Sequence, residues 1–184
     1  RQIYFFTISG GEPFVREDLL DLIGKHHDAF FQIYTNGTLI DEAVADRLLD
    51  LGNAMPAISV EGYEEATDAR RGTGTYSRVT SAMRRLQARK LLFGISVTAT
   101  RGNHDIITRE EFFDHYIERG AMFAWVFQYI PIGRDPDVRL MPTPEQRTEL
   151  RRFIHGLHRT KPMFIGDFWN DGVYTGGCMA GGRI

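Results

Sequence analysis

The chain has 184 residues, of which 42% are hydrophobic and 25% are charged, and its formal net charge is −2. This length and composition suit one globular domain with a full core. The small net charge excludes a strongly basic surface for nucleic acid or an anionic membrane, and the apolar runs are far shorter than the ~20 residues of a membrane span. A single cysteine excludes an internal disulfide framework and predicts a cytoplasmic protein.

In chain order, five apolar runs rich in β-branched and aromatic residues are predicted to be strands. Their starts lie about 30 residues apart, which is the length of one strand–helix–strand unit. The runs are residues 3–8, 30–35, 57–60, 92–99 and 124–130.

The segments between these runs carry helical periodicity, as in residues 76–90. Continuous apolar strands that alternate with helices predict an α/β fold with a parallel sheet. The stretch from Gly166 onward has no periodicity and is predicted to be irregular. Capping signals predict where three helices begin: Asp41, the pair Thr108 and Glu111, and the pair Thr143 and Gln146.

In parallel strand–helix repeats, ligands bind at the C-terminal ends of the strands. The first strand is followed by "SGGEP", in which Gly10 and Gly11 let a ligand touch the backbone and Glu12 suits an ammonium group. A plain turn between strand and helix is the alternative. Asn36 in "TNGT" follows the second strand and by itself favours a structural turn.

The third strand is followed by further polar residues. Ser59 and Glu61 lie two positions apart and are expected on one side of the extended chain. Glu61 is a candidate general base or ligand anchor, with a solvated strand end as the alternative. Arg71, in "RRGTGTY", has a guanidinium that suits a carboxylate or phosphate, although most arginines are surface residues.

The remaining candidate is Cys178 in "GGCMAGG". A lone cysteine is usually inert. Its position in a glycine-rich stretch fits a metal or cluster ligand whose partners lie beyond Ile184.

Together, "SGGEP", "TNGT", "SVEG", "RRGTGTY" and "PIG" resemble the radical S-adenosylmethionine (SAM) enzymes over Ile3 to about Arg159. The "GGEP" stretch resembles the best-known secondary motif of the family, which follows its second strand. "GGCMAGG" resembles the start of a C-terminal SPASM or twitch extension that binds an auxiliary iron–sulfur cluster through Cys178.

This resemblance implies a partial (β/α)6 barrel of the TIM type whose first strand–helix unit is missing. In the family, a CxxxCxxC motif binds a 4Fe-4S cluster, and reductive cleavage of SAM yields a 5′-deoxyadenosyl radical that abstracts hydrogen from substrate. The chain lacks that motif. The resemblance therefore implies a fragment truncated at both ends and inactive alone. It divides into a core over residues 1–160 and, over 161–184, a connector with the start of the extension.

The resemblance also assigns roles to individual residues. It implies that Gly10, Gly11 and Glu12 hold the SAM amino group, and that Ser59 and Arg71 hold the carboxylate or ribose. Residues 128–132 would pass the adenine, and Asn36 would face the same site. Glu61 matches an acidic position near the substrate.

The implied partners are a peptide, protein or small-molecule substrate and an electron donor such as flavodoxin or ferredoxin, with no nucleic acid and no membrane. Two other hypotheses stay open at this point. One is a metal-dependent barrel lyase or hydrolase that uses Glu61. The other is a non-catalytic binding domain that has lost its cluster.

Overall fold

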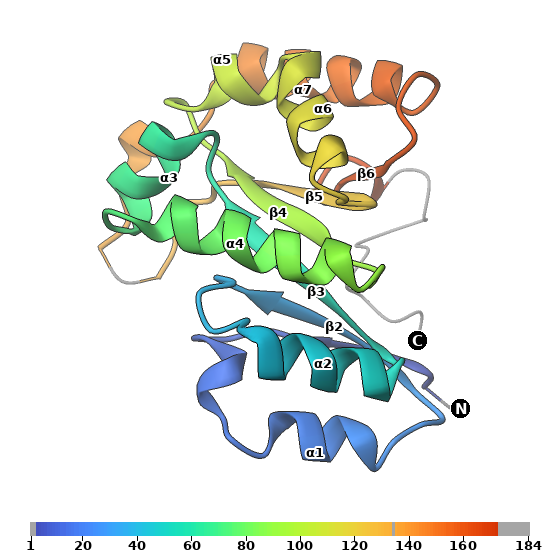
Figure 1. Cartoon of the computed structure of the whole chain (residues 1–184). Helices are drawn as coiled ribbons and strands as arrows, with labels where there is room; N and C mark the ends of the chain where they lie inside the picture. The colour runs from blue at the N-terminus through green and yellow to red at the C-terminus, as the bar shows by residue number, and fades with distance from the viewer. Residues whose placement is uncertain (1–2, 134, 173–184) are drawn as a thin grey trace.

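The computed structural model describes residues 3–133 and 135–172, which form a parallel sheet of six strands (Figure 1). The strands lie side by side in chain order, and the sheet curls into part of a barrel. This confirms the predicted α/β fold class. The strands are β1 (Phe5–Ile8), β2 (Phe30–Thr35), β3 (Ala54–Val60), β4 (Gly94–Ala99), β5 (Phe123–Gln128) and β6 (Phe164–Asp167).

The helices connect successive strands and cover the outer side of the curved sheet (Figure 1). The α-helices of the described residues are α1 (Leu19–Gly24), α2 (Glu42–Leu51), α3 (Glu64–Arg71), α4 (Thr75–Ala88), α5 (His104–Ile107), α6 (Glu110–Glu118) and α7 (Pro144–Leu157), and two short 3-10 helices are η1 (Pro13–Val15) and η2 (Val138–Leu140). None of them combines the length and apolar character that a membrane crossing requires.

Alternation along the strands separates the two faces of the sheet. Ile33 on β2, Ile58 on β3 and Val97 on β4 belong to the buried core between the sheet and the helices. Burying one such side chain contributes about 1.5–3 kcal/mol. This shared core fixes the register of the strands, because a one-residue shift would move the apolar set to the other face.

All five predicted strands are present, with ends that differ by up to three residues. The sixth strand, β6, was not predicted. It is only four residues long, and Ile165 is its fully buried apolar side chain. Pairing with β5, rather than a sequence pattern, defines β6, so the expectation of an irregular stretch from Gly166 is wrong for Gly166 and Asp167.

Of the three predicted helix caps, two are present and one is not. Asp41 accepts the Val44 N–H at 2.9 Å, and Thr143 forms the predicted capping box with Gln146. The box at Thr108 is wrong. Thr108 is instead the C-cap of the short helix α5, where its hydroxyl donates to the His104 carbonyl at 2.7 Å, and the N-cap of α6 is Arg109, which makes no side-chain capping hydrogen bond.

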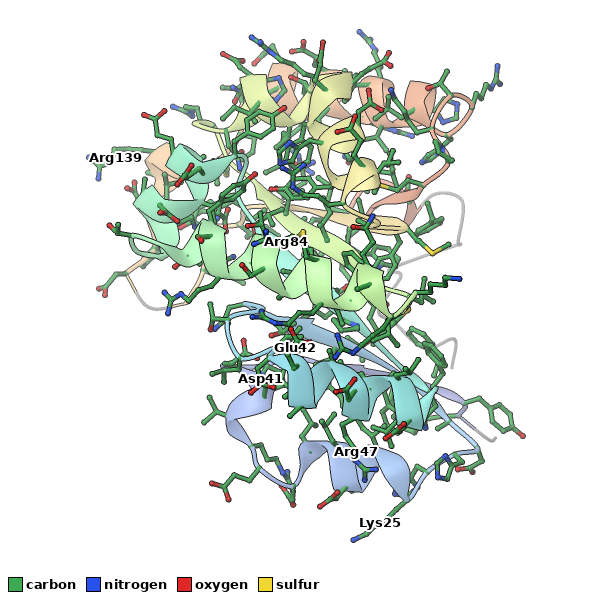
Figure 2. All side chains as sticks on the ribbon, viewed as in Figure 1. Lys25, Asp41, Glu42, Arg47, Arg84 and Arg139 are labelled. Carbon is green, nitrogen blue, oxygen red and sulfur yellow. The ribbon has the colours of Figure 1, made fainter. Side chains whose placement is uncertain are left out.

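On the outer surface, an ion-pair network joins α2 to α4. Glu42 accepts from Arg85 at 3.0 Å and from Arg89 at 2.8 Å, and Arg89 also binds Asp46 at 2.7 Å. The hydrogen bond from Arg89 holds the pKa of Asp46 below its usual value. Figure 2 labels Glu42 in the first turn of α2, at the α2 end of this network.

Candidate functional site

One carboxylate, Glu12, ties together the loops after β1 and β2. Its Oε1 accepts the Thr35 hydroxyl at 2.7 Å and the Phe14 N–H at 3.2 Å, and its Oε2 accepts the Asn36 N–H at 2.6 Å. Three donors leave part of the capacity of a carboxylate, about four lone-pair sites, for a further donor. The "GGEP" loop is therefore held in place by the residue that was predicted to bind an ammonium group.

Gly10 and Gly11 precede Glu12 and are both exposed. A Cβ placed on either one would meet no atom within 4 Å, so packing against the described residues does not require glycine there. Gly10 has φ +140°, which residues with a side chain rarely adopt. The open space beside this backbone is what a ligand that contacts main-chain atoms needs.

Asn36 shapes the loop after β2. Its Oδ1 accepts the Thr38 N–H at 2.8 Å and the Thr38 hydroxyl at 2.6 Å, which is the turn that the sequence favours. Gly37 has φ +74°, and a Cβ there would lie 2.9 Å from Ile58 Cγ2. The turn therefore packs against the core, and no described residue accepts a hydrogen bond from the side-chain Nδ2 of Asn36.

Ser59 lies on the face of the sheet opposite the helices. Side chains alternate along a strand, and Ile58 and Val60, before and after it in β3, belong to the core that faces the helices. The Ser59 hydroxyl lies 3.2 Å from that of Ser96, its register partner on β4. Aromatic rings line the same face farther along the sheet. Phe127 contacts Tyr34 and Phe168 at centroid distances of 5.7 and 4.8 Å, and burial raises the pKa of Tyr34.

Glu61 follows β3 and is enclosed by two arginines. Its side chain is 3% exposed. Arg71 donates to Oε1 from Nε at 2.9 Å and from Nη2 at 2.5 Å, and Arg70 pairs with Oε2 through Nη1. The structure therefore brings the two predicted residues Glu61 and Arg71 into direct contact, together with Arg70, which was not predicted.

The "RRGTGTY" segment folds around Asp68. The carboxylate accepts the Gly74 N–H at 2.6 Å and the Tyr76 N–H at 2.8 Å, and these backbone hydrogen bonds lower the pKa of Asp68. Gly72 and Gly74 have φ of +100° and +77°, so this turn needs glycine at both positions. It joins Arg71, the last residue of α3, to Thr75, the first residue of α4.

A polar depression of about 340 Å³ lies beside this turn, lined by Asn36, Thr38, Arg71, Thr75 and Arg78. Two of the predicted residues, Asn36 and Arg71, thus share one cavity although 35 positions separate them in sequence (71 − 36). Gly10, Gly11 and Ser59 are not part of its lining, but Glu12 adjoins it through its hydrogen bond to Asn36.

Four residues of this region were not predicted. Thr75 and Arg78 line the cavity, Asp68 holds the glycine-rich turn, and Arg70 binds Glu61. Asp68 did carry a signal, since an aspartate ahead of a glycine-rich turn accepts backbone N–H groups at a helix start. Arg78 carried none, because one arginine on a helix is typical of a solvated surface. Cys178 lies outside the described residues.

A parallel βα half-barrel with polar loops at the C-terminal ends of its strands places the protein in the βα-barrel class. Residues 1–116 match the Radical SAM superfamily. The chain belongs to this superfamily.

Its relatives include mycofactocin maturase MftC of Mycobacterium tuberculosis (strain CDC 1551 / Oshkosh), 34% identical over 81% of this chain and 39% of the maturase. An AdoMet-dependent heme synthase of Methanosarcina barkeri is 30% identical over 76% of this chain and 41% of the synthase. The chain thus spans less than half the length of these curated relatives.

Among solved structures, native anSMEcpe with bound AdoMet and Cp18Cys peptide has a TM-score of 0.72 and 20% identity, over 96% of this chain and 54% of that one. At this identity the likeness shows the fold. The fold is therefore that of the radical SAM barrel, as predicted.

Proposed function

We propose that this chain is the SAM-binding part of a radical SAM enzyme, and that the loops after β1, β2 and β3 hold the amino-acid end of SAM. The observation that carries this proposal is the exposed Gly10–Gly11 backbone, with open space beside it, followed by Glu12, whose hydrogen bond to Asn36 connects it to the polar cavity lined by Arg71. An ammonium group needs oxygen acceptors and a carboxylate needs a guanidinium, and the two kinds of partner adjoin here.

In this proposal the backbone carbonyls of Gly10 and Gly11 and the carboxylate of Glu12 accept the amino group of SAM. The cavity lined by Asn36 and Arg71 takes its carboxylate. Ser59, on the face opposite the helices, hydrogen-bonds the carboxylate or the ribose, and the backbone of residues 128–132 passes the adenine. Bound SAM would supply the 5′-deoxyadenosyl group that serves, after one-electron reduction by a cluster outside this chain, to abstract hydrogen from a substrate.

The residues of this chain do not fit the 4Fe-4S cluster of the family, because the sequence contains one cysteine. No three His, Cys, Asp or Glu side chains of the described residues gather as a metal site either. We therefore assign the cluster ligands to sequence outside this chain, and Cys178 to an auxiliary cluster. We place the radical SAM core at residues 1–160, extended by β6, and the start of a SPASM-type extension after it.

The exposed outer edge of β1 favours the proposal that another strand precedes it in the sequence. Among the described residues, β1 pairs only with β2, and Ile3, Tyr4, Phe5 and Phe6 are exposed. An open apolar strand edge favours pairing with another strand. We propose that a preceding strand–helix unit covers this edge in the parent protein and carries the cysteines.

For partners we propose a peptide, protein or cofactor precursor as substrate, in line with the maturase and synthase names of the relatives. An electron donor of the flavodoxin or ferredoxin type would reduce the cluster. The metal-dependent lyase alternative has no support in the described residues, where the carboxylate of Glu61 is occupied by arginines.

The test is anaerobic reconstitution of the full-length protein with iron and sulfide, followed by incubation with SAM and a strong reductant. The expected result is a brown protein that releases 5′-deoxyadenosine and methionine. A protein that gains no chromophore and leaves SAM intact would favour the non-catalytic binding domain.

A further inference from the structure

Among the described residues, both oxygens of the Glu61 carboxylate bind arginines, and the carboxylate is buried. Oε1 accepts two hydrogen bonds from Arg71 and Oε2 pairs with Arg70, while the side chain is 3% exposed. A general base needs an oxygen within hydrogen-bond reach of the proton that it removes. The geometry of Glu61 suits an anchor for the two guanidinium groups.

The backbone of Glu61 is fixed from both sides. Its N–H donates to the Thr67 hydroxyl at 3.3 Å, and its carbonyl accepts Asn103 Nδ2 at 3.0 Å. The same Nδ2 donates to the Thr98 carbonyl at 2.9 Å, so a buried amide links the ends of β3 and β4. The carboxylate is therefore attached to backbone that hydrogen bonds hold at the end of the sheet.

Arg71 is oriented by this arrangement. Nε and Nη2 both bind Oε1 of Glu61, while Nη1 makes no hydrogen bond with the described residues. Arg71 lines the polar depression with Arg78, and its side chain is 27% exposed. Glu61 carries one negative charge and pairs with both Arg70 and Arg71, so a net positive charge remains beside the cavity. This charge favours an anionic group there.

We propose that Glu61 is a positioning residue: it binds Nε and Nη2 of Arg71 and so leaves Nη1 for the carboxylate of bound SAM, with Arg70 as the second partner that satisfies Oε2. This inference rests on the proposed function and replaces the role of catalytic base for Glu61. It predicts that Glu61 affects ligands with a carboxylate and spares ligands without one.

The experiment measures the dissociation constants of SAM and of 5′-methylthioadenosine for the full-length reconstituted protein. 5′-Methylthioadenosine keeps the adenosine and the sulfur but lacks the amino-acid part. Glu61→Gln is expected to weaken SAM binding about tenfold, the equivalent of ~1.4 kcal/mol, and to change binding of 5′-methylthioadenosine less than about twofold.

Arg71→Lys is the second variant, because its partly exposed side chain makes misfolding a smaller risk than at Glu61. It should reproduce the selective loss of SAM binding. The double variant Glu61→Gln/Arg71→Lys should lose no more than Arg71→Lys alone, since both changes remove one shared interaction. Glu42→Gln, which removes an exposed carboxylate that also binds two arginines, is the matched control and should leave both constants unchanged.

Three outcomes would overturn the proposal. Glu61→Gln with unchanged SAM affinity but lost turnover would make Glu61 a base. Equal losses for both ligands, or additive effects in the double variant, would make its role purely structural. Absence of SAM binding in the unmodified protein would refute the proposed function itself, and the inference with it.

Discussion

Two glutamates of this protein each bind two arginines, and they differ in where they lie. Glu61, at the C-terminal end of β3, is 3% exposed, whereas Glu42, on the outer face of α2, is 65% exposed. Water competes for the ion pairs of Glu42 and screens them. The same residue types therefore fix side-chain geometry at the strand ends but contribute little on the outer helices.

The largest expected effect is at Glu61. Glu61→Gln leaves two guanidinium groups beside each other without a counter-charge, and removal of one partner of a buried ion pair is strongly destabilising. Because both arginines are partly exposed, we expect a loss of about 2–3 kcal/mol in the free energy of unfolding, below the fully buried case. Chemical denaturation of the protein that contains this chain measures it.

The matched change at the outer face is Glu42→Gln. An exposed ion pair contributes about 0.2–1 kcal/mol, so the loss should stay below about 1 kcal/mol and shrink further in high salt. Equal losses at Glu42 and Glu61 would show that burial does not separate the two clusters, and the comparison would fail.

Two glycines allow the same comparison between the strand ends and the outer helices. Gly37 at the site and Gly52 at the end of α2 have similar φ, +74° and +67°. Substitution by alanine should cost about 1 kcal/mol at Gly52, from backbone strain alone. At Gly37 the added Cβ would also lie 2.9 Å from Ile58, and overpacking should bring the loss to about 2–3 kcal/mol.

The difference between Gly37→Ala and Gly52→Ala in thermal unfolding is the informative quantity, because the strain is common to both. A larger loss of stability for Gly52→Ala than for Gly37→Ala would mean that the turn after β2 shifts easily to accommodate the added Cβ. The site would then be less rigid than these contacts indicate.

The smallest expected effect is a pH dependence at His115. Its Nε2 lies 2.6 Å from the Tyr76 hydroxyl, next to the turn that carries Arg71, and burial, with Arg119 nearby, lowers the pKa of His115. A lowered folded-state pKa means that the unfolded chain binds the proton first. Stability is therefore complete above the ordinary histidine pKa of about 6.5 and declines as the pH falls from there toward the folded-state pKa.

His115→Gln removes the titrating group and keeps a hydrogen-bonding side chain. The difference in melting temperature between the protein and this variant, measured between about pH 7 and 5, should grow as the pH rises toward 7. A difference that stays constant with pH would show that His115 does not titrate differently in the folded protein.

Much of the fold could be predicted from the sequence, because its main signals are local. Apolar runs about 30 residues apart predicted strands that are all present, and Asp41 and Thr143 cap helices as expected. The "GGEP" motif predicted the family that residues 1–116 match. These features depend on side chains a few positions apart, which the sequence displays directly.

Other features depend on residues that are distant in sequence or ordinary in type. β6 exists because β5 pairs with it, and α5 removes Thr108 from the predicted cap. The sequence singled out Glu61 and Arg71 separately, but folding brought them together and added Arg70. Burial then determines that Glu61 binds arginines rather than water, and burial is a property of the packed chain that residue type and spacing do not fix.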